Sequence, residues 1–127
     1  MMGMQDRYTP GDDVGALDHW PFDNPLSAYR ILSGAPVTSG RIDKGGPGHT
    51  TRYGIWRCTQ GAFECTEQGD ELMTVLAGRC CITWTGTGAQ RRLEAGDTLF
   101  IQDQSRVIWD VTEEVTKVFF GHKPGGY

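Results

Sequence analysis

The sequence lacks the features that would direct the protein to a membrane, a secretory route or nucleic acid. No apolar stretch approaches the roughly 20 residues that a membrane-spanning helix needs. Residues 1–7 have no apolar core of a signal peptide. No run of Lys or Arg is present, and the net charge is −4, which disfavours non-specific nucleic-acid binding. We therefore expect a cytoplasmic protein with neither a membrane nor a nucleic-acid partner.

Cysteine is sparse, and the common catalytic motifs are missing. The four cysteines form no Cys-x-x-Cys pair, which excludes a zinc knuckle and argues against a disulfide framework. We expect reduced thiols that pack as small apolar residues. The sequence contains no glycine-rich phosphate loop before a helix, no Gly-x-Ser-x-Gly and no His-Glu-x-x-His.

What the sequence does contain is a series of short runs rich in Val, Ile, Thr, Phe and Trp, separated by turn residues. Such runs predict an antiparallel all-β sandwich or barrel, and no segment keeps a helical period long enough to compete. With 127 residues the chain is long enough for one domain with its own core. We expect an irregular N-terminal arm over 1–27, a β domain over 28–123 and a tail over 124–127. Trp20 and Phe22 would anchor the arm on the surface or across a partner subunit.

The stretch 63–85 organises the predicted barrel. A strand over Phe63–Glu67 leads into a turn at 68–70, and Glu71 opens a second strand. We expect that strand to close at a glycine turn at Gly78, before a third strand over Cys80–Thr85. We also expect a strand over Thr51–Cys58 and, after a tight turn at Gly96-Asp97, a strand over Thr98–Gln102. Near the C-terminus, the runs 106–111 and 115–121 predict a hairpin.

Two spacings in this chain resemble the motifs of the cupin superfamily, which are small antiparallel jelly-roll barrels (double-stranded β-helices). Six residues separate Glu71 from Gly78, and Gly96-Asp97 forms the turn of a second motif. More narrowly, the chain resembles single-domain cupins similar to the cupin domain of (S)-ureidoglycine aminohydrolase. The matching pieces are Gly54-Ile-Trp56, Gly61-Ala-Phe63, Trp109-Asp-Val111 and Val115-Thr-Lys117-Val118. The resemblance implies a homodimer, and chemistry at C–N bonds of ureido or amino compounds.

The histidine ligands of metal-binding cupins are absent from the matching positions. Cys65 and Glu67 stand where the first motif has His-x-His, and Val107 stands near the histidine position of the second. Of the four usual metal ligands, only the glutamate is present at its position, as Glu71. We therefore expect no metal cofactor; the alternative is an atypical site in which Cys65, Glu67 and Glu71 ligate a metal.

Strand alternation predicts which side chains share a face, and the resemblance implies which face is inside, because Val107 stands near a ligand position of metal cupins. Across the expected hairpin, Val107 opposes Phe119 and Trp109 opposes Lys117, and directly opposed residues share a face. A buried lysine is costly unless it is paired, so Lys117 should meet Glu71 or Glu67. We predict Glu71 and Lys117 as an acid/base pair, and a ligand-binding lining of Cys65, Glu67, Trp109, Trp56, Tyr53 and Val107.

Plainer roles remain open for the same residues. Glu71 would then only accept backbone hydrogen bonds, Lys117 would extend to the rim of the barrel, and the tryptophans would only pack in the core.

These features predict a small-molecule-binding cupin without a tightly bound metal, whose ligand is a small polar metabolite that is carboxylated or nitrogenous. One alternative is an aminohydrolase-like enzyme acting on C–N bonds. Another is a structural or interaction module with a filled barrel.

Overall fold

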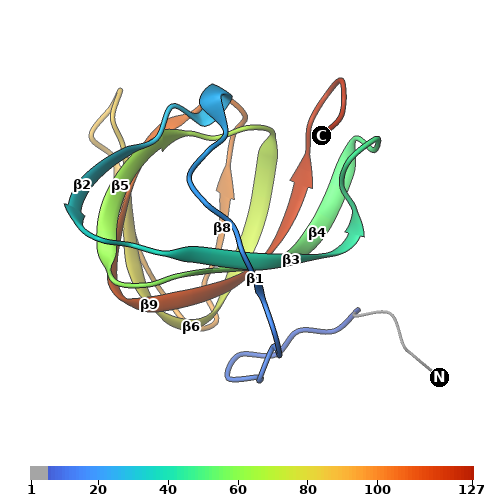
Figure 1. Ribbon diagram of the computed structural model, residues 1–127. Helices are drawn as coiled ribbons and strands as arrows, with labels where there is room; N and C mark the ends of the chain where they lie inside the picture. The colour runs from blue at the N-terminus through green and yellow to red at the C-terminus, as the bar shows by residue number, and fades with distance from the viewer. Residues whose placement is uncertain (1–5) are drawn as a thin grey trace.

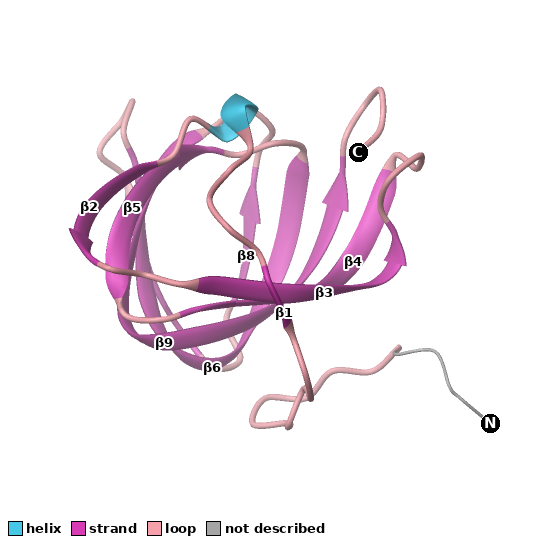
Figure 2. Cartoon of the chain, viewed as in Figure 1, coloured by secondary structure: helices cyan, strands magenta, loops and turns pink. Residues whose placement is uncertain are grey.

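The computed structural model describes residues 6–127, which form an antiparallel jelly-roll barrel (Figure 1). The expected arm over 1–27 begins with residues 1–5, which lie outside the described residues. Among residues 6–127 the one helical element is a short 3-10 turn, η1, at the upper end of the barrel (Figure 2). The elements are β1 (Asp18–His19), η1 (Pro25–Ser27), β2 (Arg30–Gly34), β3 (Thr38–Gly45), β4 (Thr51–Cys58), β5 (Gly61–Thr66), β6 (Asp70–Trp84), β7 (Gln90–Glu94), β8 (Thr98–Ile101) and β9 (Arg106–His122).

Two long strands, β6 and β9, form the frame of the barrel. They pair antiparallel along almost their whole length, from Asp70 opposite His122 to Trp84 opposite Val107. Strands β4 and β5 flank β9 along its two halves, while β7 and β8 pair with the two halves of β6. Figure 1 shows both long strands curving around the barrel, so that the two halves of each strand face different parts of the interior.

The continuity of these two strands corrects two expectations from the sequence. Gly78 does not end a strand, because β6 continues through it to Trp84. Gly78 has a φ of 82° and lies where the register with β9 shifts, and an added Cβ would overlap the Glu114 carbonyl oxygen. The glycine therefore permits a bulge that bends the strand. The expected hairpin at 112–114 is also absent, since Arg106–His122 is one strand.

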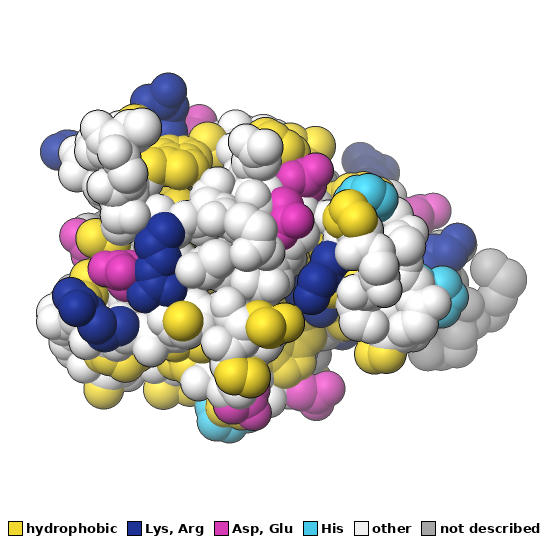
Figure 3. All heavy atoms as spheres, turned by 90° about the horizontal axis from the view of Figure 1, so that it is seen from above, with side chains coloured by type: hydrophobic (Ala, Val, Ile, Leu, Met, Phe, Trp, Pro, Cys, Tyr) yellow, Lys and Arg dark blue, Asp and Glu magenta, His cyan; other side chains and the backbone are white. Residues whose placement is uncertain are grey.

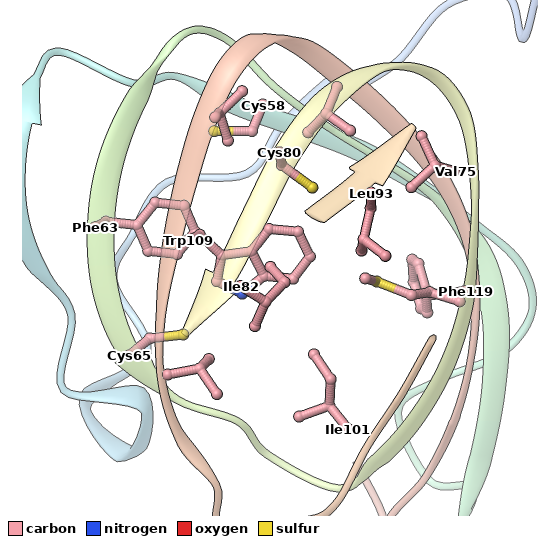
Figure 4. Packing of buried hydrophobic residues seen from close by; sticks show 14 residues of the cluster. Cys58, Phe63, Cys65, Val75, Cys80, Ile82, Leu93, Ile101, Trp109 and Phe119 are labelled. Atoms are coloured by element: carbon pink, nitrogen blue, oxygen red, sulfur yellow. The ribbon is translucent and has the colours of Figure 1, made fainter. Parts of the chain in front are cut away.

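The core lies inside the barrel and consists mainly of alternate residues of β5, β6 and β9. Phe63, Met73, Ile82, Trp109 and Phe119 are nearly inaccessible to solvent. Figure 4 shows these side chains and their neighbours pointing inward from opposite walls, with Cys65 and Ile101 toward one end. All four cysteines are free thiols, and three are buried, in agreement with packing as small apolar residues.

The N-terminal arm lies on its own barrel. Asp18 and His19 pair with β3, and the Trp20 amide donates a hydrogen bond to the Thr38 carbonyl oxygen at 3.0 Å. Phe22 packs against Phe63 with ring centroids 4.7 Å apart. Trp20 and Phe22 therefore reach the interior side of the fold. No helix in the described part of the chain is long and apolar enough to cross a membrane.

Candidate functional site

A cavity of about 160 Å³ opens at the end of the barrel near η1. Figure 3 looks onto this end, where acidic, basic and apolar side chains lie close together. The lining combines an aromatic wall with four ionisable side chains. The aromatic members are Trp20, Phe22, Tyr29, Trp56, Phe63, Trp109 and Phe119, and the ionisable side chains of Asp, Glu, Lys or Arg are Arg52, Glu67, Glu71 and Lys117.

Lys117 and Glu71 form an ion pair inside this cavity. The Lys117 Nζ lies 2.5 Å from Glu71 Oε2, and the two side chains are 5% and 17% exposed. Strand β9 places Lys117 opposite Trp56 on β4 and Val75 on β6, so its side chain points inward. The ammonium also lies 4.3 Å from the centroid of the Trp109 ring and 4.5 Å from that of Trp56. The charge is thus compensated by a carboxylate and two aromatic faces.

The inward direction of Lys117 follows from alternation along one strand rather than from a hairpin. Lys117 and Trp109 are eight positions apart on β9, and an even separation leaves them on the same face. The curvature of β9 then brings the two side chains into contact across the interior. The contact predicted from the sequence is present, although the predicted connection between the runs was wrong.

Glu67 stands beside this pair in a different environment. Its Oε1 accepts hydrogen bonds from Trp109 Nε1 at 3.0 Å and from Cys65 Sγ at 3.4 Å. Burial raises the pKa of the Glu67 carboxyl, and the neighbouring Glu71 carboxylate raises it further, while Lys117 and the Trp109 hydrogen bond oppose the shift. The environment of Glu67 therefore favours its neutral form.

Cys65 is not an activated thiol in this arrangement. Burial raises its pKa well above the ordinary value, and the Glu67 carboxylate raises it further. A thiol that remains protonated is a weak nucleophile and a poor metal ligand. Cys65 instead contributes a hydrogen bond that orients Glu67.

Two residues expected in the lining lie elsewhere. Val107 is fully buried in the core cluster and does not line the cavity. Tyr53 is three positions from Trp56 on β4, and an odd separation places it on the opposite, outer face. There its ring packs edge-on against Tyr8, with centroids 6.4 Å apart. Cys65, Glu67, Glu71, Trp56, Trp109 and Lys117 do meet around the cavity.

Sequence reasoning missed Arg52, which lies on the same face of β4 as Trp56. Their separation of four positions was a usable signal. The Arg52 guanidinium stacks over the Tyr127 ring, 4.0 Å from its centroid, and lies 5.7 Å from that of Phe119. Tyr29 was missed as a lining residue because it precedes β2; burial raises its pKa to about 12.

The donor set does not fit the metal that the resemblance to cupins implies. Within residues 6–127 no three side chains of His, Cys, Asp or Glu are grouped to hold an ion. The Glu71 carboxylate is bonded to the Lys117 ammonium, which occupies the cationic position beside it. None of His19, His49 and His122 lines the cavity.

Comparison with known proteins identifies the family. Residues 45–119, more than half of the chain, match the family model described as the EutQ-like cupin domain. No curated protein matches the sequence.

Three solved structures share the fold. A putative ethanolamine utilization protein Q from Salmonella typhimurium is 20% identical, with a TM-score of 0.57 and 70% of each chain covered. The EutQ protein of Clostridium difficile is 17% identical with a TM-score of 0.62, covering 84% of this chain and 76% of that one. A protein of unknown function from Pseudomonas syringae pv. tomato is 22% identical with a TM-score of 0.68; 86% of this chain aligns to 45% of that chain. At these identities the structures establish the fold, and the match to the family model shows that the chain belongs to the EutQ-like cupin domain family.

Proposed function

We propose that the protein binds a small polar metabolite in the cavity at the η1 end of the barrel, without a tightly bound metal. The observation that carries this proposal is the convergence of Glu67, Glu71 and Lys117 inside a cavity with aromatic walls. Binding sites for small molecules typically combine apolar walls with a few converging polar groups. The cavity volume of about 160 Å³ equals on the order of five water molecules, which suits a ligand of about five to ten non-hydrogen atoms.

The unused hydrogen-bonding capacity of the two carboxyl groups supports a ligand. Glu71 meets Lys117 through Oε2, and Glu67 accepts its hydrogen bonds through Oε1. Within residues 6–127, no hydrogen bond reaches Glu71 Oε1 or Glu67 Oε2. Among the described residues, Arg52 Nε is the one fully buried side-chain nitrogen or oxygen without a partner, so these two carboxyl oxygens are open to the cavity, where a ligand or water can donate to them.

This arrangement disfavours the alternative of a structural or interaction module whose barrel is filled by side chains. Met73, Val75 and Phe119 belong to the packed core, as that alternative requires. The ion pair lies beside them at the cavity, however, and burying charge without a function is costly.

A second candidate function is catalysis at C–N bonds, as in the ureidoglycine aminohydrolase type of cupin. It is favoured by the position of Glu71 and Lys117 side by side at the cavity, because a carboxylate and an ammonium 2.5 Å apart can divide base and acid roles. Glu71 would accept a proton from an attacking water, and Lys117, bonded to it, would return a proton to the leaving nitrogen. Release of ammonia from small ureido or amino compounds tests this candidate, and Glu71→Gln should abolish any such activity.

The binding proposal is tested by thermal shift with a library of small metabolites on chelator-treated protein, together with elemental metal analysis. Ethanolamine belongs in the library because one of the similar structures is named as a putative ethanolamine utilization protein. We expect a ligand that raises the melting temperature of the wild type but not that of Lys117→Met, and no stoichiometric metal. Lys44→Met, at an exposed lysine on β3, is the control and should respond like the wild type. Stoichiometric metal, or a ligand that stabilises Lys117→Met equally, would contradict the proposal.

We also propose a cytoplasmic homodimer. An exposed apolar row on the outer face supports the dimer: Phe100, Leu72 and Phe120 are directly opposed on β8, β6 and β9, and each is about half exposed. Light scattering coupled to size exclusion should give twice the chain mass, and Phe100→Ser should shift the distribution toward monomer.

A further inference from the structure

The Arg52 side chain points into the cavity, and no acidic side chain of the described residues forms an ion pair with it. It lines the cavity beside Trp20 and Phe119. No ion pair within residues 6–127 includes Arg52, and its Nε is buried without an acceptor. Guanidinium groups carry five donors and are rarely buried unpaired. An acceptor from outside the chain would complete this group.

The Tyr127 ring fixes the plane of the guanidinium. Arg52 Cζ lies over the Tyr127 ring, 4.0 Å from its centroid. The backbone of Tyr127 is hydrogen-bonded to that of Gly48 and His49. A stacked guanidinium keeps its N–H groups at its edge, where they match a planar oxyanion. The arrangement is therefore prepared for a ligand that meets Arg52 edge-on.

Arg52 carries the uncompensated charge of the cavity. Glu71 and Lys117 neutralise each other at 2.5 Å. Burial favours the neutral form of Glu67, so this carboxyl does not offset the guanidinium fully. The uncompensated guanidinium suits a ligand that carries a carboxylate.

Arg52 and Glu71 are the two ends of one row across the sheet. Both stand directly opposite Gly121, Arg52 from β4 and Glu71 from β6. Two strand spacings separate their Cα atoms by about 10 Å. A ligand of a few carbon atoms can therefore touch the Arg52 edge at one end and the carboxyl groups of Glu67 and Glu71 at the other.

We propose that the ligand is a short amino or hydroxy carboxylic acid, with its carboxylate bound by Arg52 and its N–H or O–H group bonded to the free oxygens of Glu67 and Glu71. This assignment rests on the binding function proposed above and names the class of ligand. A carboxylate is favoured over a phosphate because a second negative charge would lie close to Glu71 in a small cavity.

The test compares small carboxylates with partners that lack the carboxylate. Titration calorimetry at pH 7 measures glycine against glycinamide and ethanolamine, β-alanine against its amide, and glycolate against ethylene glycol, with inorganic phosphate as a further arm. The panel extends to amino and hydroxy acids of up to six carbons, each with its primary amide. We expect the tightest binder to be a carboxylate with a Kd at least about 10-fold below that of its partner.

Variants assign the preference to Arg52. Arg52→Gln should weaken carboxylate binding at least about 10-fold and leave the partner compounds unchanged, while Arg52→Lys should be intermediate because it keeps the charge but not the planar fork. Arg57→Gln is the matched control on the same strand, since Arg57 is absent from the lining and pairs with Glu114. If Arg52→Gln does not fold, Arg52→Lys carries the comparison.

The outcomes separate this inference from the binding function itself. Amides or ethanolamine binding as tightly as the carboxylates, tighter binding of phosphate, or a carboxylate preference that survives in Arg52→Gln would overturn the inference and leave the cavity as a binding site. If no member of the panel binds but another metabolite stabilises the protein, the inference also fails. Only the absence of any ligand would refute both.

Discussion

The sharpest test of the site is to remove the ammonium and leave the carboxylate, by Lys117→Met. Methionine keeps an unbranched side chain of similar length, so the change removes charge more than volume. Breaking a buried ion pair by deleting one partner costs about 3–5 kcal/mol, because the other charge remains uncompensated. Glu71 is 17% exposed and lies at a cavity, which allows some hydration and places the expected loss near the lower limit, about 3 kcal/mol.

The measurement is denaturant unfolding at pH 7 together with the melting temperature, which should fall by on the order of 10 °C in a domain of this size. Adding Glu71→Gln to Lys117→Met removes the stranded charge, so the double variant should recover to within about 1 kcal/mol of the wild type. Lys44→Met should change stability little. The reasoning fails if Lys117→Met loses less than about 1 kcal/mol, or if the double variant is no more stable than the single one.

Three further predictions concern the strand bulge, the arm and the pH dependence. Gly78→Ala should destabilise strongly, because its φ is 82° and a Cβ would overlap the Glu114 carbonyl; a wild-type melting temperature would contradict the bulge. Gly40→Ala should displace the arm, because the new Cβ would overlap the Trp20 ring; amide exchange of residues 8–22 should accelerate, and unchanged protection would refute the contact. Burial raises the pKa of Glu67 above its ordinary 4.5, so its contribution to stability is present below pH 4.5 and is lost as pH rises through the higher folded value. Glu67→Gln should flatten that decline, and an unaltered profile measured by urea unfolding would refute the shift.

Much of the fold followed from local signals in the sequence. The strand Thr51–Cys58 was predicted with the bounds that the structure shows, because its branched and aromatic residues are bounded by turn signals on both sides. The turn at Gly96-Asp97 and the strand after it were likewise visible. The continuity of the two long strands was not visible. Gly78 in β6 and the polar run 112–114 in β9 resemble turns in the sequence, and only the pairing of β6 with β9 satisfies the backbone groups there.

The sequence by itself determined the inward face of each strand. Alternation placed Glu71, Trp109 and Lys117 on the interior side, and the cost of a buried ammonium required a carboxylate partner. Parity along β4 would also have found Arg52 and excluded Tyr53, because Trp56 marks the inner face.

Only the tertiary structure decided which inward residues meet. Glu71 and Lys117 are 46 positions apart, and their contact depends on the register of β6 with β9 and on the curvature of both strands. The tertiary structure also decides that Val107 packs in the core cluster, although it stands opposite Cys65 on β5, while Cys65 and Glu67 line the cavity. Alternation repeats every two residues along any strand and carries no information on depth in the barrel, so the height of each side chain is set by long-range pairing.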